Sequence, residues 1–404
     1  MVVRITYLHQ YFNTPSMPGS TRSYEMGRRL VARGHEVNVV TSWHDPDGRK
    51  DWFTTDEAGM KVYWLPVPYS NHMSYNRRIA SFFKFAWGAA RKAASLPADV
   101  VFPTSTPLTI ALPGAYAARC QRVPMVFEVR DLWPDVPIAM GALTNPIMIR
   151  ASLLLEQFAI KNADAFVALF DRARDSLIAK GVRNDLIEVI PNGSDLQLFG
   201  AGNGQIIRQK LGCSPETNLI LYAGAFGRVN GVSYIVNLAN QLRRDDRFKF
   251  LLIGDGFEKG TVLRQAKEGN LLGKNLFSED QVSKSAIVDY FAAADICMST
   301  VIPLKILEGD SANKVFDGLA AGKLIATNHG GQLTNLLEKT GAGLHLDHDF
   351  SVAARQLQDY ADYPERLAKA KIAARKLAED HFSRDKLAIK LEEVLLRTVA
   401  HSKA

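Results

Sequence analysis

The chain of 404 residues has little cysteine and no long apolar run. Its three cysteines, Cys120, Cys213 and Cys297, lie far apart and form no CxxC pair, which argues against a disulfide framework and a cysteine-ligated metal site. The first residues lack the features of a signal peptide, and no run approaches the roughly 18 apolar residues of a spanning helix. We therefore expect a cytoplasmic protein in which any membrane association is peripheral.

Several catalytic signatures are also absent. The chain has no Walker A motif, no G-x-S-x-G, no HExxH and no GxGxxG after its first predicted strand. The signatures of ATPases, serine hydrolases, zincins and dinucleotide oxidoreductases are therefore missing. Asp45-Pro46-Asp47 resembles a metal-binding DxD only superficially, because it lies in a polar segment rich in Pro and Gly. We expect neither a metal nor a cofactor.

The net charge of +7 is unevenly spread. Residues 1–190 hold 22 Lys and Arg against 17 Asp and Glu. A modest excess in one half fits an anionic substrate or an anionic membrane surface better than nucleic acid, which usually meets denser basic clusters. We predict no nucleic-acid partner.

Short apolar runs alternate with helix-like periodic segments, a pattern that predicts parallel sheets covered by helices. Predicted strands lie at 3–8, 36–41, 61–66, 100–103, 125–128, 165–169, 187–190, 219–222, 248–253, 276–277, 296–298, 324–327 and 343–346. Predicted helices lie at 22–33, 77–95, 108–122, 147–162, 171–180, 231–244, 256–269, 284–294, 313–321, 331–339 and 351–360, followed by 365–400, which Ser383 divides in two. The pattern restarts after 200–204. We predict two doubly wound α/β domains with the active site at the carboxyl ends of their strands, between the halves.

The segment SANKVFDGLAAG, residues 311–322, predicts a loop that opens into a helix. A helix start presents unpaired N–H groups and a partial positive charge, so Asn313 and Lys314 suit a phosphate-bearing ligand. Asp317 would then accept hydrogen bonds from sugar hydroxyls. The alternative is a core helix that buries Val315 and Leu319.

Two further loops fit the same ligand. GAFGRVNG, residues 224–231, follows a predicted strand and carries Arg228, whose guanidinium can bind diphosphate oxygens. The alternative is a structural turn with a solvated arginine. Near the N-terminus, Gly19 and Ser20 open the first helix after a strand that ends at His9, so this loop could also meet a diphosphate.

Charged residues are dense in EVRDLWPD, residues 128–135, directly after an apolar strand. Each charge there needs solvent or a partner, which favours a functional role for this segment and for Arg130 and Asp131 in particular. PNGSD, residues 191–195, predicts a turn that connects the two domains.

The predicted helix 77–95 combines basic and aromatic side chains. Arg77, Arg78, Phe82 and Trp87 are among them, with Lys84, Phe83 and Phe85. Aromatic and basic side chains on one helix suit the headgroup region of an anionic bilayer. The alternative is a half-buried core helix with solvated basic residues.

In this order, TYLHQYF, PGSTR, VRDLWPD, IPNGSDLQLF, YAGAFGR, LLIGDG and NKVFDGLAAGK make the chain resemble retaining GT-B glycosyltransferases of family 4 over essentially its whole length. Within the family it looks most like bacterial L-fucosaminyl transferase-like enzymes of O-antigen or capsule synthesis. The resemblance implies an acceptor-binding Rossmann-like domain at 1–195 with a crossover helix at 384–404. It also implies a donor-binding Rossmann-like domain at 205–383.

The resemblance also assigns roles to residues. Arg228 matches the first of the family's two basic diphosphate ligands, while the second is missing from 229–242, so we expect Lys314 to supply that charge. Asp317 matches the glutamate that binds ribose. Gly309 stands where the family has its other glutamate, which leaves Glu308 as the expected donor-sugar ligand. Arg130 replaces the family's histidine, so Asp131 is the expected acceptor-orienting carboxylate.

The resulting hypothesis is a metal-independent, retaining transfer of an N-acetylated hexosamine from a UDP-sugar to a polyprenyl-diphosphate-linked acceptor at the inner face of the cytoplasmic membrane. One alternative is a nucleotide-sugar epimerase of the same fold, which needs no acceptor and no membrane face. Another is a non-catalytic nucleotide-sugar-binding protein.

Overall fold

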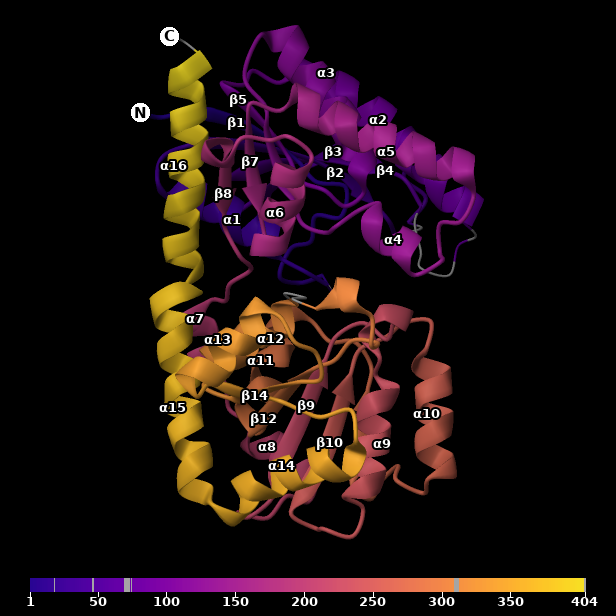
Figure 1. Cartoon of the computed structure of the whole chain (residues 1–404). Helices are drawn as coiled ribbons and strands as arrows, with labels where there is room; N and C mark the ends of the chain where they lie inside the picture. The colour runs from indigo at the N-terminus through magenta and orange to yellow at the C-terminus, as the bar shows by residue number, and fades with distance from the viewer. Residues whose placement is uncertain (18, 46, 69–72, 74, 309–311, 403–404) are drawn as a thin grey trace. The chain divides into compact units, whose positions relative to one another are not determined.

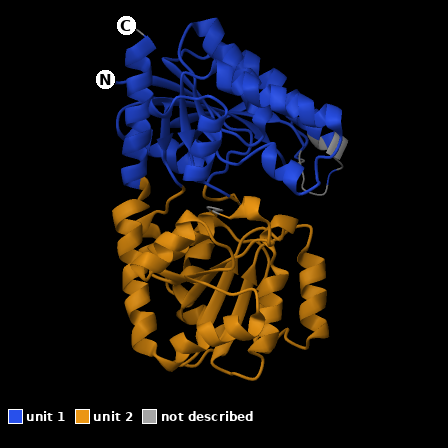
Figure 2. Ribbon diagram, in the orientation of Figure 1, with its two compact units in different colours: residues 1–14, 20–191, 385–404 blue, residues 15–19, 192–384 orange. Residues whose placement is uncertain are grey.

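The computed structural model describes residues 1–17, 19–45, 47–68, 73, 75–308 and 312–402. They form two compact units (Figure 2). Unit 1 consists of residues 1–14, 20–191 and 385–404, and unit 2 of residues 15–19 and 192–384. The chain therefore leaves unit 1 after Pro191 and returns to it at Asp385.

The sheet of unit 1 is built mainly from parallel strands (Figure 1). Its strands are β1 (Arg4–Leu8), β2 (Glu36–Trp43), β3 (Phe53–Glu57), β4 (Met60–Pro66), β5 (Val100–Pro103), β6 (Val126–Val129), β7 (Ala165–Ala168) and β8 (Ile187–Val189). They pair in the order β3-β4-β2-β1-β5 and β6-β7-β8, and parallel bridges at Val101–Met125 and Thr104–Glu128 join β5 to β6. Since β1 pairs with both β2 and β5, the strand order reverses there, and ligands of such sheets bind at that point.

Helices cover the strands of unit 1. They are α1 (Arg22–Ala32), α2 (Tyr75–Ser95), η1 (Leu108–Ile110), α3 (Ala111–Gln121), α4 (Asp135–Ala139), α5 (Pro146–Asn162), α6 (Asp171–Ala179), η2 (Asn184–Leu186) and α16 (Arg384–Ser402). Side chains of α2, α3, α5 and α6 share one apolar core with strand residues such as Leu8, Val101 and Phe127.

Polar contacts attach α16 to the α1 region. The Arg29 guanidinium lies 2.6 Å from the Asp385 carboxylate. Glu392 accepts hydrogen bonds from Arg33 and, at 2.8 Å, from His35 Nε2. His35 Nδ1 accepts a hydrogen bond from the backbone N–H of Val3 at 3.2 Å, so the neutral tautomer that carries its proton on Nε2 satisfies both contacts.

Unit 2 has a six-stranded parallel sheet. Its strands are β9 (Asn218–Ala223), β10 (Phe248–Ile253), β11 (Leu276–Glu279), β12 (Ile296–Ser299), β13 (Leu324–Thr327) and β14 (Gly343–His345). Their order, β11-β10-β9-β12-β13-β14, is that of a Rossmann fold. The strand order reverses between β9 and β12, which places the expected ligand crevice at the carboxyl ends of these two strands.

Alternating strand residues of unit 2 face two different cores. Tyr222 and Leu252 belong to one core, and Leu221 and Leu251 belong to the other, as the period of two in a strand requires. The covering helices are α7 (Leu196–Gly200), α8 (Gln205–Lys210), η3 (Arg228–Asn230), α9 (Ser233–Gln241), α10 (Lys259–Glu268), α11 (Lys284–Ala293), η4 (Lys305–Leu307), α12 (Asn313–Ala320), α13 (Gln332–Thr340), α14 (Phe350–Asp362) and α15 (Pro364–His381).

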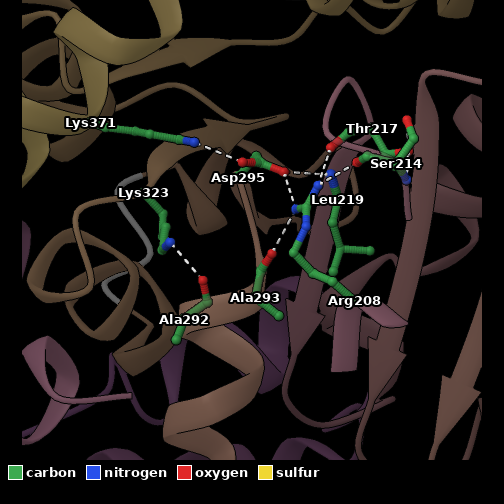
Figure 3. A network of polar contacts seen from close by, with 9 residues as sticks. All are labelled: Arg208, Ser214, Thr217, Leu219, Ala292, Ala293, Asp295, Lys323 and Lys371. Atoms are coloured by element: carbon green, nitrogen blue, oxygen red, sulfur yellow. Dashed lines mark hydrogen bonds and ion pairs between the residues drawn. The ribbon is translucent and has the colours of Figure 1, made fainter. Parts of the chain in front are cut away.

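A polar network centred on Asp295 ties together the amino ends of the strands in unit 2 (Figure 3). The Asp295 carboxylate contacts Arg208 at 2.8 Å and Lys371 at 2.7 Å, and accepts the backbone N–H of Leu219 at 2.9 Å. Burial alone would raise the pKa of Asp295, but Lys371, Leu219 and Arg208 outweigh it and hold the pKa below its ordinary value. This network lies at the end of the sheet opposite the expected crevice, so its role is structural.

The two ends of the 192–384 segment are hydrogen-bonded to each other. The backbone N–H of Ser194 donates to the carbonyl of Phe382 at 3.0 Å, and the N–H of Arg384 donates to the carbonyl of Ser194 at 3.1 Å. A parallel bridge pairs Ser194 with Ser383. The predicted division of the C-terminal helical region at Ser383 is confirmed, because α15 ends at His381 and α16 begins at Arg384.

The predicted α/β alternation is confirmed, with one strand, three short α-helices and the 3-10 helices η2, η3 and η4 missed. The strands predicted at 100–103, 248–253 and 324–327 have the observed bounds. The structure adds the antiparallel edge strand β3 and the short helices α4, α7 and α8. These elements are five or six residues long, too short for an apolar period to stand out.

Candidate functional site

Lys314 lies at the carboxyl end of β9, where the strand order of unit 2 reverses. Its side chain is buried, and Nζ lies 4.2 Å from the centroid of the Tyr222 ring. A Cβ at Gly224 would lie 2.9 Å from Nζ, so the glycine leaves the space that the ammonium occupies. A cation and the first turn of α12 thus meet the Gly-rich loop, the combination that binds phosphate in α/β folds.

Side-chain hydrogen bonds to two of its carbonyl groups hold the Gly-rich loop in place. Tyr222 Oη donates to the carbonyl of Ala225 at 2.7 Å, and Thr300 Oγ1 donates to the carbonyl of Asn230 at 2.7 Å. Gly254 has φ +142°, and a Cβ there would lie 1.9 Å from the carbonyl oxygen of Gly224. The glycine of LLIGDG is therefore needed for close packing against this loop.

Arg228 begins η3 on this loop and is exposed. Its guanidinium carbon lies 5.0 Å from the centroid of the Phe257 ring. Stacking on an aromatic face leaves the edge N–H groups of a guanidinium available to oxyanions. Arg228 is therefore exposed on the Gly-rich loop, and its predicted diphosphate contact stays a prediction.

Asp317 is not the free acceptor that the sequence predicts. Its side chain is buried, Oδ1 accepts a hydrogen bond from Ser194 Oγ at 2.8 Å, and Oδ2 lies 2.7 Å from Lys284 Nζ. The Lys284 ammonium also lies 4.4 Å from the centroid of the Phe199 ring. A carboxylate has about four lone-pair positions, so these two contacts orient Asp317 and leave others for a ligand.

The remaining donor-site predictions fall partly outside the described residues. Asn313 is the first residue of α12 and is half-buried. Glu308 is exposed and follows η4. Residues 309–311, which include Gly309 and the first residue of the SANK segment, lie outside the described part of the chain. The core-helix alternative also holds, because Val315, Phe316 and Leu319 are buried.

In unit 1, a cluster around Arg130 lies where the strand order reverses. The Arg130 guanidinium contacts His9 Nε2 at 3.0 Å and Ser20 Oγ at 3.3 Å, and its backbone N–H donates to Ser105 Oγ at 3.0 Å. Arg130, Ser20 and His9 are thus brought together, a contact that the sequence analysis does not predict. Gly19, next to Ser20, has φ +118°, a conformation that requires glycine.

His9 is neutral in this cluster. Burial, with the charges of Arg130 and His44, holds the pKa of His9 well below its ordinary value. Arginine can only donate, so Nε2 accepts and the ring proton is on Nδ1. Nδ1 is buried and has no partner among the described residues.

The charge density of EVRDLWPD has a largely structural origin, which corrects the functional interpretation of two of its acids. Glu128 is fully buried and lies 2.9 Å from Arg22, whose guanidinium also donates to the carbonyls of Ile190 and Pro191. Asp135 pairs with Lys180 at 3.0 Å.

Asp131, by contrast, is exposed. Its Oδ2 accepts a hydrogen bond from Thr106 Oγ1 at 2.6 Å. It also lines a small crevice beside α5 and α6. Asp131 is therefore the acid of the segment that is positioned to meet a ligand.

The aromatic side chains of α2 divide between core and surface. Trp87 is 70% exposed and Phe83 is 53% exposed, whereas Phe85 is buried and Phe82 is half-buried. The predicted outward position is therefore wrong for Phe85. Arg77 is exposed, and the side chain of Arg78 lies outside the described part of the structure.

Ser194, Lys284 and Tyr222 contact the predicted site residues but were not predicted. Ser194 belongs to a segment that the sequence marks only as a turn, and Lys284 carries no motif. Within the described residues, no group of three or more His, Cys, Asp and Glu side chains is arranged to hold a metal ion. Nor is any helix in that part of the chain both long and apolar enough to cross a bilayer.

Family comparisons agree with this geometry. A model described as a glycosyl transferase 4-like domain matches residues 19–193, and one described as glycosyl transferases group 1 matches residues 217–369. The chain belongs to the family 4 glycosyltransferases. The first matched region contains Arg130 and Ser20 but not His9, and the second contains Lys314 and the Gly-rich loop at 224–231.

The glycosyltransferase has distant relatives of known name. It is 24% identical over 87% of its length to the D-inositol 3-phosphate glycosyltransferase of Nocardiopsis dassonvillei, 82% of which is covered. It is 23% identical over 63% of its length to an Escherichia coli protein provisionally named colanic acid biosynthesis glycosyl transferase WcaI. That match spans 66% of WcaI, just under two thirds.

Solved structures confirm the GT-B fold of the glycosyltransferase. Sucrose-phosphate synthase from Thermosynechococcus elongatus matches with a TM-score of 0.80 and 16% identity, over 98% of this chain and 99% of that one. Anabaena HepE in complex with UDP-glucose matches with a TM-score of 0.71 and 16% identity, over 98% and 100%. WaaG, a glycosyltransferase involved in lipopolysaccharide biosynthesis, matches with a TM-score of 0.68 and 16% identity, over 97% and 99%.

If Asp317 binds a nucleotide ribose, Lys284→Met is expected to raise the Kd for UDP about tenfold. The substitution removes a charged hydrogen bond at 2.7 Å that orients the carboxylate, and such bonds contribute about 1.5–3 kcal/mol. Calorimetric titration with UDP measures the effect. Lys210→Met, which removes an exposed pair with Glu279, is the matched control and should leave Kd unchanged. An unaltered Kd in folded Lys284→Met would contradict the predicted role of Asp317.

Proposed function

We propose that this glycosyltransferase transfers an N-acetylated hexosamine from a UDP-sugar to a polyprenyl-diphosphate-linked acceptor, with retention at the anomeric carbon. The observation that carries the proposal is the buried Lys314 ammonium at the start of α12, beside the Gly-rich loop that bears Arg228. The complex of HepE with UDP-glucose supports a uridine nucleotide as the donor. The resemblance to L-fucosaminyl transferase-like enzymes motivates the choice of sugar.

In this proposal, unit 2 binds the donor and stabilises its leaving diphosphate. Lys314, Arg228 and the first N–H groups of α12 place positive charge where negative charge develops as the glycosidic bond breaks. Asn313 and Glu308 contact the donor, and Asp317 holds the ribose. Ser20 and Gly19 complete the donor loop from the N-terminal region.

Unit 1 binds the acceptor in the same proposal. Asp131 orients the attacking hydroxyl, and Arg130 supplies a cation for its diphosphate. The leaving diphosphate oxygen takes the proton from that hydroxyl, so the protein mainly positions the two substrates. We propose that no metal or other cofactor takes part.

The test is a matrix of donors and acceptors with the full-length protein. UDP- and GDP-sugars are first ranked by thermal shift, since ligands that bind only the folded state raise its melting temperature. The best donors are then incubated with short-chain polyprenyl-diphosphate sugars, with and without EDTA, and the anomeric configuration of the product is determined by NMR. An epimerised donor formed without lipid would replace the proposal with an epimerase. Tight binding without turnover on any acceptor would replace it with a binding protein.

We also propose that the exposed face of α2 binds the inner face of an anionic membrane. Trp87 and Phe83 protrude from it, and Arg91 lies 5.2 Å from the Trp87 ring centroid. Residues 75–95 contain no acidic residue. Aromatic side chains at the headgroup boundary beside basic ones produce this kind of reversible binding.

Trp87→Ser is expected to weaken binding to phosphatidylglycerol-rich vesicles about tenfold, because a large apolar side chain contributes about 1.5–3 kcal/mol on burial. Vesicle co-sedimentation measures the effect, and wild-type binding should also fall with added salt. Ile372→Ser on α15, an equally exposed position at 71%, is the control and should bind like the wild type. Equal losses in both variants would contradict the assignment of α2.

A further inference from the structure

Phe257 is an exposed aromatic residue in the segment that follows β10. Its side chain is 66% exposed, so burial in a core does not explain a phenylalanine at this position. The ring instead contacts Arg228 of the Gly-rich loop, with the guanidinium carbon 5.0 Å from the ring centroid. A guanidinium within about 6 Å of a ring centroid makes a favourable cation–π contact. The side chain of Phe257 is therefore placed to act on Arg228.

Backbone hydrogen bonds join the segment after β10 to the Gly-rich loop. The N–H of Gly224 donates to the carbonyl of Ile253 at 2.9 Å. The N–H of Phe226 donates to the carbonyl of Asp255 at 2.9 Å, and the N–H of Glu258 donates to the carbonyl of Phe226 at 2.8 Å. The ring and the guanidinium thus project from two segments whose backbones are bonded to each other, so their separation is set locally.

The guanidinium of Arg228 forms no ion pair within the part of the chain that the structure describes, and the Phe257 ring is its contact there. An exposed arginine otherwise samples many rotamers, and a ligand that fixes one of them must overcome the loss of that freedom. Contact with a flat ring restricts the side chain beforehand. It also leaves the N–H groups at the edge of the guanidinium available to oxyanions.

We propose that Phe257 is a positioning residue that holds the Arg228 guanidinium ready for the diphosphate of the donor. The inference rests on the proposed function, in which Arg228 binds that diphosphate. Binding to a side chain that is already ordered loses less conformational entropy, so the ring strengthens diphosphate binding without touching the ligand. An exposed ring can also stack on a nucleobase, and the experiment separates these two roles.

The test compares UDP with uridine, which lacks the diphosphate. Phe257→Leu keeps an apolar side chain but removes the ring, and we expect it to raise the Kd for UDP about two- to fivefold, the usual effect of an exposed cation–π contact. Calorimetric titration measures this Kd. The Kd for uridine, measured by NMR titration, should be the same in the variant and the wild type.

Two variants control for other effects of the substitution. Phe257→Tyr keeps the ring and should bind UDP like the wild type, a rescue that loss of general packing does not predict. Tyr363→Leu removes a ring that is 57% exposed at the start of α15 and should also leave the Kd for UDP unchanged. The melting temperatures of all variants should match that of the wild type.

A double-mutant cycle tests whether the ring acts through Arg228. Arg228→Met should raise the Kd for UDP by itself, and Phe257→Leu added to it should cause no further change. An unchanged Kd for UDP in Phe257→Leu, or a further loss of full size in the double variant, would overturn the positioning role while UDP binding continues.

Two other outcomes separate the inference from the function on which it rests. Equal losses for uridine and UDP in Phe257→Leu would assign the ring to the nucleobase and overturn the positioning role. UDP binding that depends on the ring through Arg228, in a protein that transfers no sugar to any acceptor, would overturn the proposed function and leave the positioning role standing.

Discussion

Lys314→Met should lower kcat/KM for sugar transfer about 10²–10³-fold, the usual effect of removing one preorganised group that stabilises developing charge. The expected reason is local. The Lys314 ammonium is buried where the strand order of unit 2 reverses. Methionine at this position retains the packing against Tyr222 and Gly224 but carries no charge. Initial rates at saturating and at limiting donor concentration measure the effect, which should include a fall in kcat.

Two variants sharpen this experiment. Lys339→Met removes an exposed lysine at the end of α13 and should leave the rate unchanged. Lys314→Arg restores the charge but not the fit beside Gly224, so its rate should lie between the other two. A fall of less than about threefold in Lys314→Met would show that Arg228 and the helix start suffice for the chemistry.

Arg22→Met should lower the free energy of unfolding of unit 1 by about 3–5 kcal/mol, because it leaves the carboxylate of Glu128 buried without its main cation. Both side chains are essentially inaccessible, at 2% and 0% exposure. Urea unfolding followed by tryptophan fluorescence measures the loss. All five tryptophans lie between residues 43 and 133, so the signal reports on unit 1.

The controls for this prediction use the same chain. The double variant Arg22→Met with Glu128→Leu should recover much of the loss, since an apolar pair can replace a buried ion pair. Arg4→Met, which breaks the exposed pair with Asp99, should change stability little. An equally large loss in Arg4→Met would contradict the assignment to burial.

The same ion pair predicts the direction of a pH effect. Burial alone would raise the pKa of Glu128, but Arg22, Arg130 and the Thr104 hydroxyl outweigh it, so the pKa lies below its ordinary value. A carboxyl group with a depressed pKa stabilises the fold at neutral pH, and that contribution is lost as the pH falls through its folded-state pKa. Arg22→Met should therefore lose less stability on acidification than the wild type does.

The strands and helices were largely predictable because apolar period and glycine position are local properties. β10 (FKFLLI) and β13 (LIAT) are mainly apolar and mostly buried in the sheet, with Lys249 and Thr327 as their polar members, and such runs stand out in a sequence. β3, with the sequence FTTDE, is polar, half-exposed and antiparallel at the sheet edge. Its pairing depends on β4 rather than on its own pattern.

Partners distant in sequence explain what could not be predicted of the site. Arg228 lies on a Gly-rich loop and Lys314 on the first turn of α12, and both segments can be recognised in the sequence. Asp317 is oriented by a serine 123 residues away, in a segment that the sequence marks only as a turn, and by a lysine 33 residues away that belongs to no motif. The pairing of Glu128 could not be predicted from the sequence, because its partner Arg22 lies 106 residues earlier. The sequence thus shows which residues are ionisable, but it does not show which of them form ion pairs with one another.

The hydrogen bonds between Ser194 and the Phe382–Arg384 segment have an evolutionary consequence. The two ends of the 192–384 segment are hydrogen-bonded to each other. A different domain with ends paired in the same way can therefore replace this segment, because the chain still leaves and re-enters unit 1 at the same two positions. On the proposal that unit 1 binds the acceptor and unit 2 the donor, recombination at these junctions gives chimaeras that keep one acceptor preference and acquire another donor. New glycan linkages could then arise without redesign of unit 1.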